Sequence, residues 1–247
     1  MLATKSFFDA AKSRLEVIKE SQRENVLAAA KMMGDCMEDN GVVQLFGLDH
    51  GIAFAMELGY RAGGLMPFHK MQTVDLVMRG AISDAEYNDP NLYDRTELAE
   101  TLWNLYNIVP EDMFILVSFA GNEGIIVETA LKAKERGHKV IAVVSKALAA
   151  VSESRHPSGK KLTDLADLVI DNGADAEDSL VDVDGVHKMN QIATISGNII
   201  AQMITAETYH YLTAQGKDCP VLLSVNVKGA DEHNKAMSDK YIGRWES

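Results

Sequence analysis

The sequence has few cysteines, few prolines and no long uninterrupted apolar run. Only Cys36 and Cys219 are cysteines, and neither has a neighbouring partner for a zinc knuckle or a redox pair, so we expect a reduced, intracellular protein. The five prolines leave little room for a disordered linker. The start of the chain lacks the apolar run of a signal peptide, and polar residues break the most apolar long stretch, 192–206. We therefore expect a cytoplasmic protein that does not cross a membrane.

Positive charge is also scarce. The formal net charge is -12, so no basic stripe is available to neutralise phosphates, and we expect no nucleic-acid partner. Hydrophobic residues make up 47% and charged residues 24% of the 247 residues, which is ordinary for a globular enzyme. This length favours one large domain, alone or with a helical extension, over two domains of equal size.

The first 40 residues predict one long helix or two shorter ones. Apolar residues recur at roughly helical spacing between residues 5 and 38, and the run ends near Asn40-Gly41. We expect residues 1–40 to form a helical extension and residues 41–247 to form the main domain. The extension packs either on a second subunit or on its own sheet, and the sequence favours neither.

Short apolar runs after residue 40 predict a parallel sheet. Continuous Val, Ile and Leu runs separated by helical segments are typical of strands covered on both faces, so we expect a doubly wound α/β sandwich. Functional groups should then lie at the carboxyl ends of the strands. The expected strands cover residues 42–46, 65–68, 113–117, 139–144, 167–170 and 221–225.

Two strand-loop-helix units carry glycine-marked loops that should meet at this edge. The first loop is Gly47-Leu48-Asp49-His50-Gly51, and the second is Ser118-Phe119-Ala120-Gly121-Asn122-Glu123-Gly124. Such loops aim backbone N–H groups and a helix dipole into a cleft, which ordinarily favours an anion. Asp49 and Glu123 would oppose an anion, so the sequence leaves the anchoring group of the ligand open.

Two further segments have two interpretations each. Residues 70–95 contain several turn-forming residues and predict either a lid over the cleft or a surface loop without a role. Residues 154–161 concentrate polar donors, including Arg155, His156 and Lys160, and are either solvated or face the substrate.

Glu57 and His50 are the first candidates for catalysis. Glu57 follows the first loop by two helical turns among apolar residues, which suits a general base; alternatively it only pairs with Arg61 at the (i, i+4) spacing. His50 can relay a proton from the strand end, or it is merely solvated. Asp49 could orient the His50 ring or accept sugar hydroxyls, and a metal site at this pair lacks a clear set of further ligands.

The segment Gly229-Ala230-Asp231-Glu232-His233-Asn234 follows the last expected strand and precedes a helix. We therefore expect Asp231 and His233 at the carboxyl edge of the sheet as well. The alternatives are that Asp231 only caps the helix and that His233 is solvated.

Taken together, these segments resemble the sugar isomerase (SIS) domain family, and specifically a bacterial branch that carries the label phosphoheptose isomerase. The resemblance spans nearly the whole chain. It rests on the order of elements, the second loop, and the segments Phe46-Gly47-Leu48-Asp49-His50-Gly51, Glu57-Leu58-Gly59-Tyr60-Arg61-Ala62-Gly63-Gly64, Ser154-Arg155-His156-Pro157-Ser158-Gly159-Lys160-Lys161-Leu162 and Asp231-Glu232-His233-Asn234.

The resemblance implies a flavodoxin-like three-layer α/β/α sandwich with a central parallel sheet. It implies a homodimer or homotetramer with the active site near the subunit interface, and no metal or cofactor. Family enzymes isomerise sugar phosphates or cleave a sugar ether, and Glu57 matches their glutamate base by position. A histidine, sometimes from the neighbouring subunit, assists, and His50 and His233 are the candidates. The residues that the resemblance places at the substrate are Gly47, Asp49, Gly51, Arg61, Ser118, Gly121, Asn122, Glu123, Arg155, His156 and Asp231.

The departures from the family pattern concern phosphate binding. Gly51 stands where the first loop usually closes with Ser, and the second loop has Ala120 where a second Ser is usual. A carboxylate within ~4 Å of a phosphate costs on the order of 1 to 4 kcal/mol. We therefore expect an aldose-ketose isomerase that works through a cis-enediol on an unphosphorylated, amino or sulfonated sugar. The alternatives are a phosphosugar isomerase, a sugar ether lyase, or a non-catalytic sugar sensor.

Overall fold

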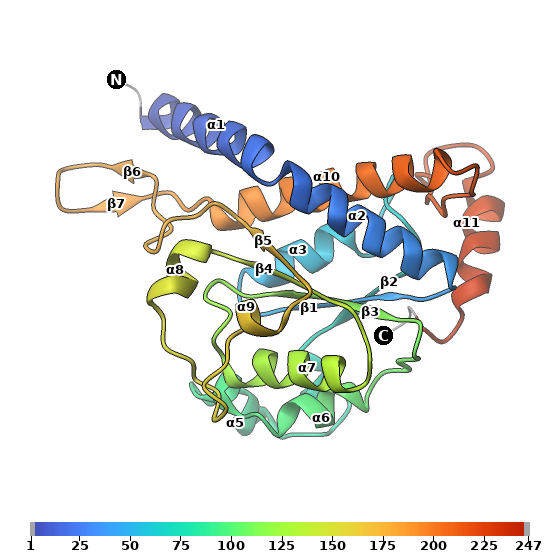
Figure 1. Cartoon of the computed structure of the whole chain (residues 1–247), viewed down its shortest axis with the longest axis horizontal. Helices are drawn as coiled ribbons and strands as arrows, with labels where there is room; N and C mark the ends of the chain where they lie inside the picture. The colour runs from blue at the N-terminus through green and yellow to red at the C-terminus, as the bar shows by residue number, and fades with distance from the viewer. Residues whose placement is uncertain (1–2, 245–247) are drawn as a thin grey trace.

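The protein is a three-layer α/β/α sandwich, as the sequence predicts (Figure 1). The computed structural model describes residues 3–244. Five parallel strands form the central sheet in the order β2-β1-β3-β4-β5, which is the order of flavodoxin-like folds. The strands are β1 (Val43–Gly47), β2 (Phe68–Met71), β3 (Met113–Val117), β4 (Val140–Val144) and β5 (Leu168–Asp171).

Helices cover both faces of the sheet. One face packs on α2 (Arg23–Glu38), α3 (Gly51–Leu58) and α10 (Ala193–Thr213), and the other on α6 (Leu98–Trp103) and α7 (Gly124–Glu135) (Figure 1). The remaining helices are α1 (Ala3–Ser21), α4 (Val74–Met78), α5 (Asp84–Tyr87), α8 (Lys146–Val151), α9 (Leu162–Leu165), α11 (Ala230–Ser238) and the 3₁₀ turns η1 (Leu92–Asp94) and η2 (Asp239–Tyr241).

Strand β3 illustrates why the continuous apolar runs belong inside. Ile115 and Val117 face the core under α2, α3 and α10, whereas Phe114 and Leu116 face the core over α6 and α7. All five residues of β1, β3 and β4 are buried. Both faces of these strands are therefore removed from water, which explains the absence of alternation in their sequences.

Two expected strands differ in the structure. The strand expected at 65–68 lies at Phe68–Met71, and Leu65 forms only an isolated antiparallel bridge with Val221. The strand expected at 221–225 is absent from the described sheets. The side chain of Asn234 donates to the Leu223 carbonyl and accepts from the Leu223 amide, both at 2.8 Å, so that backbone turns toward α11 instead of pairing with a strand.

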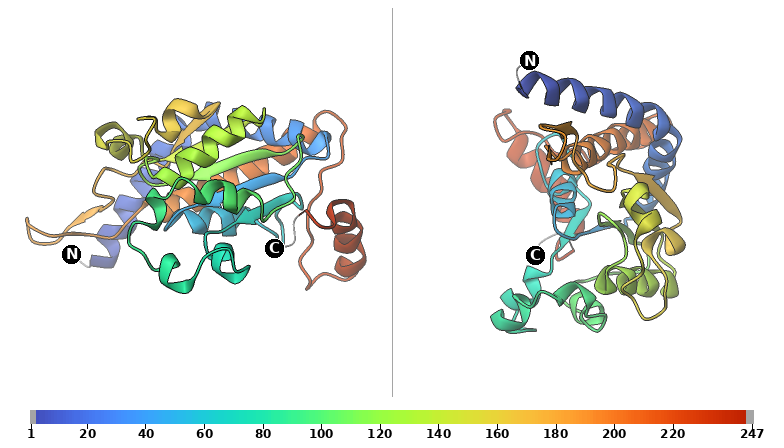
Figure 2. Two further views of the ribbon diagram at one scale, coloured as in Figure 1. Left: turned by 90° about the horizontal axis from the view of Figure 1, so that it is seen from below. Right: turned by 90° about the vertical axis from the view of Figure 1, so that its left-hand side faces the viewer.

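The N-terminal segment forms two helices with a break at Gln22. Its side-chain oxygen accepts from the Asp171 amide at the end of β5, at 3.0 Å, which ties the break to the sheet. Helix α1 extends beyond the sandwich beside the hairpin of β6 (Val181–Asp182) and β7 (Lys188–Met189) (Figures 1 and 2). Among the helices of residues 3–244, none is long and apolar enough to span a bilayer.

A buried polar chain crosses the amino ends of β1, β2 and β3. The Asp112 carboxylate accepts from the Gln44 amide at 3.0 Å and pairs with Arg244, and the Gln44 carbonyl accepts from His69 Nδ1 at 2.8 Å. Burial lowers the pKa of His69 to about 4, although the nearby Asp75 carboxylate opposes the shift. Burial therefore favours the neutral form of His69 in the folded protein.

We predict that His69 makes the protein acid-sensitive. An unfolded histidine takes up a proton near pH 6.5, whereas His69 in the folded protein does so only near pH 4, so stability falls as pH drops between these values. The loss should reach about 3 kcal/mol and should be missing in His69→Asn, whose amide donates the same hydrogen bond. Urea unfolding between pH 7 and pH 4 measures it. His187→Asn, a change at an exposed histidine, should lose as much unfolding free energy between pH 7 and pH 4 as wild type. An equally large loss in His69→Asn would refute the prediction.

Candidate active site

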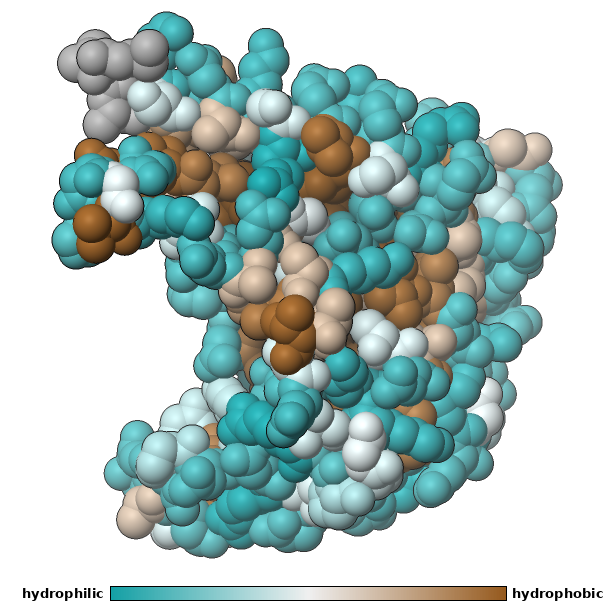
Figure 3. All heavy atoms as spheres, turned by 60° about the vertical axis from the view of Figure 1, so that its left-hand side comes forward, coloured by the Kyte–Doolittle hydropathy of each residue, from teal (hydrophilic) through white to brown (hydrophobic). Residues whose placement is uncertain are grey.

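A pocket of about 180 Å³ lies at the carboxyl edge of the sheet, where the first turns of α3 and α10 meet the ends of β1 and β3. The molecule is visibly hollowed on the side that carries the β6–β7 hairpin (Figure 3). The pocket residues come from both glycine-marked loops, from the adjoining parts of α3, β3 and β4, from the segment after β5, and from α10 and the residues just before it. They are Leu48, Asp49, His50, Gly51, Phe54, Val117, Ser118, Phe119, Val143, Asn172, Glu177, Asp178, Gln191, Ala193, Thr194, Gly197 and Asn198.

The first loop turns tightly against the end of β3. A Cβ on Gly47 would lie 2.3 Å from the Gly51 carbonyl oxygen, and a Cβ on Gly51 would lie 2.7 Å from the Val117 carbonyl oxygen. Asp49 has a left-handed backbone (φ 48°), and it and His50 are exposed at the pocket. Burial, together with the Asp49 carboxylate, raises the pKa of Tyr93 to about 12. Tyr93 of the 70–95 excursion therefore lies beside the first loop.

In the second loop the hydrogen-bond donors are directed at a carboxylate of the protein itself. Glu123, at the N-terminus of α7, is 8% exposed. Its Oε2 accepts from the Ser118 hydroxyl at 2.6 Å and from the backbone amide of Asn122 at 3.2 Å. The Gly121 amide donates to Ser118 Oγ at 2.8 Å. A helix N-terminus stabilises negative charge, and here Glu123 supplies that charge. A bound anion at this loop would meet Glu123 first.

Two acidic residues that the sequence analysis did not single out complete the pocket. Glu177 and Asp178 follow β5 and line the wall beside α10. Asp178 is 6% exposed, and its Oδ1 accepts from the amides of Ile192 and Ala193 at 3.0 and 2.9 Å, so it caps α10 from a distant segment. Among the described pocket residues none is Lys or Arg, whereas Asp49, Glu177 and Asp178 are carboxylates.

One pocket residue that the sequence analysis missed, Asn172, could have been found from the rule that functional groups lie at the carboxyl ends of parallel strands. Asn172 directly follows β5 and lies in the pocket, as the rule for parallel sheets requires. Glu177 and Asp178 lie farther along an irregular segment with no periodicity, and the residues of α10 reach the pocket only through tertiary packing. No local sequence signal identifies those positions.

Glu57 lies just outside the pocket, on the seam between α3 and α10. It is three residues, about one helical turn, beyond the pocket residue Phe54. Its Oε1 accepts from the Gln202 amide of α10 at 2.6 Å, and its Oε2 pairs with Arg61. The Glu57 side chain is 22% exposed. The carboxylate is thus fixed and partly buried, and its ion pair with Arg61 is the one that the spacing predicts.

Arg155 and His156, which were also expected at the substrate, contact other side chains of the protein. Arg155 pairs with Asp94 at 2.5 Å, and His156 contacts Glu128 and Ser158, each at 2.8 Å. Neither Arg155 nor His156 lines the pocket described above. These contacts tie the 154–161 segment to α7 and η1.

His233 and Asp231 do not lie at the carboxyl edge of the sheet, contrary to expectation. They lie on α11, at the opposite end of the molecule from the β6–β7 hairpin (Figure 1). His233 Nε2 contacts the Val221 carbonyl at 2.9 Å and borders a separate pocket with Asn40, which precedes β1. The expectation fails because no strand leads into α11. The N-cap of α11 is Gly229, so Asp231 is not the cap.

Metal ligands are not gathered in the part of the chain that the structure describes. Within residues 3–244, no three His, Cys, Asp or Glu side chains are arranged to hold an ion. Asp49 and His50 therefore lack the further ligands that a metal site would need.

Solved structures with the same fold include two phosphoheptose isomerases. The enzyme from Francisella tularensis superposes with a TM-score of 0.57 at 15% identity, over 85% of this chain and 100% of that one. The enzyme from Neisseria gonorrhoeae gives a TM-score of 0.50 at 17% identity, over 83% and 94% of the two chains. At these identities the likeness supports a common fold and does not extend to the substrate.

Sequence relatives cover nearly the full chain. A UPF0309 protein from Geobacillus kaustophilus is 32% identical over 240 residues, which are 96% of this chain and 94% of that protein. A UPF0309 protein from Thermoanaerobacter pseudethanolicus is 33% identical over 244 residues, 96% and 97% of the two chains. The family model of the SIS domain matches residues 6–145, more than half of the chain. On this match and on its fold, the chain belongs to the SIS domain family.

Proposed function

We propose that this protein is an aldose-ketose isomerase that acts, through a cis-enediol and without a metal, on a sugar that carries no phosphate. The observation that carries the proposal is the charge of the site. In the second loop the Ser118 hydroxyl and the Asn122 backbone amide already donate to the Glu123 carboxylate. The pocket has carboxylates but no Lys or Arg among its described residues. Sugar hydroxyls and an amino group can donate hydrogen bonds to carboxylates, whereas a phosphate is repelled.

Each candidate side chain has a defined part in this reaction. Glu57 takes the C2 proton of the open-chain aldose and returns it to C1, while the hydroxyl proton on O2 passes to O1 by way of the cis-enediol. The substrate extends to Glu57 from the pocket along the α3–α10 seam. His50 moves a proton between the ring oxygen and the anomeric hydroxyl as the ring opens. Ser118 donates to Glu123 and accepts from Gly121, which leaves one lone pair for a sugar hydroxyl.

A sulfonated sugar fits this site less well than a neutral or amino sugar. Its anion would need Arg61 or Arg155, and both are engaged in ion pairs, with Glu57 and Asp94 respectively. Breaking either pair would leave a partly buried carboxylate without its partner.

We also propose that the protein is a homo-oligomer. Phe8 and Val17 of α1 are 69% and 60% exposed, which supports a homo-oligomer in which α1 packs on another subunit. His233 lies at the opposite end of its own subunit, so it would reach a pocket only from a second copy. Both cysteines are unpaired, in keeping with a reducing, cytoplasmic compartment.

One observation favours a different function, a sugar sensor without catalysis. Both carboxylate oxygens of Glu57 are engaged, by Gln202 and by Arg61, so a base would have to be released before it could act. A sensor would bind a sugar saturably without exchanging its C2 proton.

Proton NMR in deuterated water tests the reaction directly. The enzyme is incubated with matched free, amino, sulfonated and phosphorylated hexoses, and loss of the C2 proton signal is followed. We expect exchange with free or amino sugars only. Exchange restricted to phosphosugars would contradict the role assigned to the acidic site, and saturable binding without any exchange would support the sensor.

We predict that Glu57→Gln, tested with a sugar that exchanges, lowers the exchange rate by about 10² to 10⁴, because the amide keeps the shape of the side chain but cannot take a proton. Glu135→Gln makes the same change on the exposed end of α7 and should leave the rate unchanged. Exchange within a factor of a few of wild type in Glu57→Gln would show that another group is the base.

We also predict that removing the Glu123 carboxylate creates an affinity for phosphate. Glu123→Ala frees the Ser118 hydroxyl and the Asn122 amide at the N-terminus of α7, so inorganic phosphate should bind at least about tenfold more tightly than to wild type. The measurement is the phosphate-dependent shift in melting temperature. Glu153→Ala removes an exposed carboxylate near the same loop and is the matched control. An equal response in the two variants would contradict the prediction.

A further inference from the structure

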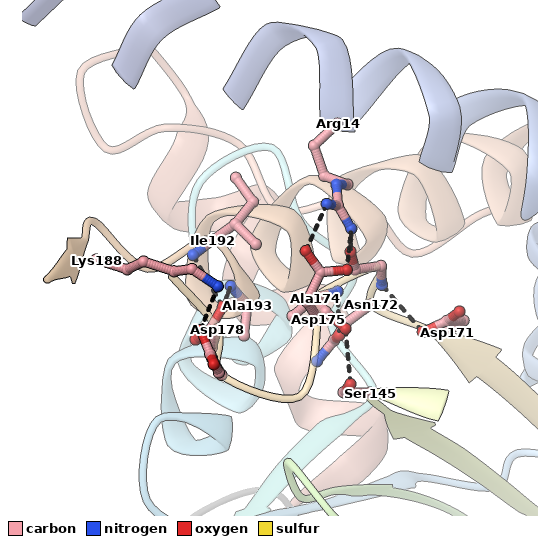
Figure 4. Close-up of polar contacts among 12 residues, drawn as sticks. Arg14, Ser145, Asp171, Asn172, Ala174, Asp175, Asp178, Lys188, Ile192 and Ala193 are labelled. Atoms are coloured by element: carbon pink, nitrogen blue, oxygen red, sulfur yellow. Dashed lines mark hydrogen bonds and ion pairs between the residues drawn. The ribbon is translucent and has the colours of Figure 1, made fainter. Parts of the chain in front are cut away.

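The segment 172–178 forms a wall of the pocket and is held in place by side chains from several elements (Figure 4). The Ser145 hydroxyl donates to the Ala174 carbonyl at 2.7 Å, and the Ala174 amide donates to Asn172 Oδ1 at 3.0 Å. The Gly173 amide donates to Asp171 Oδ1 at 3.0 Å. These contacts fix the start of the wall to the ends of β4 and β5.

Helix α1 holds the same segment from outside through Arg14. Its guanidinium donates to the Gly173 carbonyl at 2.5 Å and makes two bonds to the Asp175 carboxylate, at 3.0 and 2.8 Å (Figure 4). Gly173 has a φ of 72°, and a Cβ there would lie 2.5 Å from Ile18 of α1. The backbone of the wall therefore lies directly against the helix.

The apolar side of α1 adds to this contact. Ala11 belongs to a buried cluster with Ala174 and Ile192, and Phe7 and Phe119 pack against that cluster. Phe119 is itself a pocket residue. One side of α1 thus packs on the outer surface of the pocket.

The far end of the wall is coupled to α10. Asp178 caps α10 at Ile192 and Ala193 (Figure 4). Glu177 pairs with Lys188 of β7 at 2.6 Å. The first turns of α10 supply further pocket residues, including Thr194 and Asn198. A shift of residues 173–178 would therefore move both Glu177 and the start of α10.

We propose that Arg14 is a positioning residue: by clamping Gly173 and Asp175 it sets the wall that carries Glu177 and Asp178, and so governs how tightly the pocket holds its sugar. The sugar-binding part of this inference rests on the function proposed above. Arg14 does not line the pocket, and it acts through the segment it holds. The Asp175 side chain is 62% exposed, so the ion pair contributes little to global stability and its loss should act locally.

Hydrogen exchange measured by mass spectrometry tests the clamp without any ligand. The informative amides are those of Ala174, Asp178, Ile192 and Ala193, which are bonded within the wall or to its cap. In Arg14→Ala and in Asp175→Ala these amides should exchange about fivefold faster, with little change in melting temperature. The double variant should be no faster than Arg14→Ala, because the contact that Asp175→Ala removes is already lost when Arg14 is replaced.

Kinetics then test the effect on binding. With whichever hexose wild type exchanges, Arg14→Ala should raise KM about fivefold and leave kcat within about twofold. The exchanged pair Arg14→Asp with Asp175→Arg should restore part of the lost affinity. Arg23→Ala removes an arginine whose ion pair with Glu24 is exposed on α2, and it should match wild type in both measurements.

Two results would overturn the inference. Wild-type amide exchange in both single variants would show that Arg14 does not hold the wall, and faster exchange with unchanged KM would show that the wall does not govern binding. If no hexose undergoes C2 exchange with wild type, the proposed isomerase fails separately. Dissociation constants for the same hexoses, from ligand-observed NMR, then replace KM. Weaker binding to Arg14→Ala than to wild type supports the inference, whereas equal binding to the two proteins, or no detectable binding to wild type, refutes it.

Discussion

The contact between the first loop and the end of β3 is the constraint on which the site depends. Gly47 and Gly51 leave no room for a Cβ between the loop and its neighbouring carbonyl groups, and the Leu48 amide donates to the Val117 carbonyl at 3.0 Å. The chain can therefore leave β1 and begin α3 within a few residues, directly beside the second loop. Asp49 and Ser118, distant in sequence, thereby line one pocket.

The charge that the second loop can bind depends on which group accepts hydrogen bonds from its hydroxyl and backbone amides. A helix N-terminus and a loop of amides form an anion site whenever their donors are free. In this chain the Glu123 carboxylate is buried at that position and takes the Ser118 hydroxyl and the Asn122 amide. The Ser118 hydroxyl and the Asn122 backbone amide, which could otherwise bind an anion at the start of α7, are therefore engaged by a carboxylate of the chain itself.

The sequence predicted the elements whose structure follows from local pattern and strand order. Strands β1, β3 and β4 were evident as continuous apolar runs, and strand order brought both glycine-marked loops to one edge. The prediction failed for His233, because the Asn234 side chain takes the backbone bonds that a strand at Leu223 would have used. It missed Glu177, because an irregular segment has no periodicity and its place depends on contacts with α1 and α10.

Helix α1 packs on the outside of the pocket wall, although it precedes the first strand of the sheet in the sequence. The sequence predicts a helical extension over residues 1–40 that packs on a second subunit or on its own sheet. In the structure Ile18 packs against Gly173 and Arg14 pairs with Asp175 of the same chain. Gly173 can approach α1 this closely because it lacks a side chain and has a left-handed backbone that other residues rarely adopt. Since the pocket wall is packed between α1 and α10, removal of α1 would uncover Ala174 and Ile192, which α1 now buries. The N-terminal helix is thus part of the packing that shapes the pocket, whatever else its exposed face contacts.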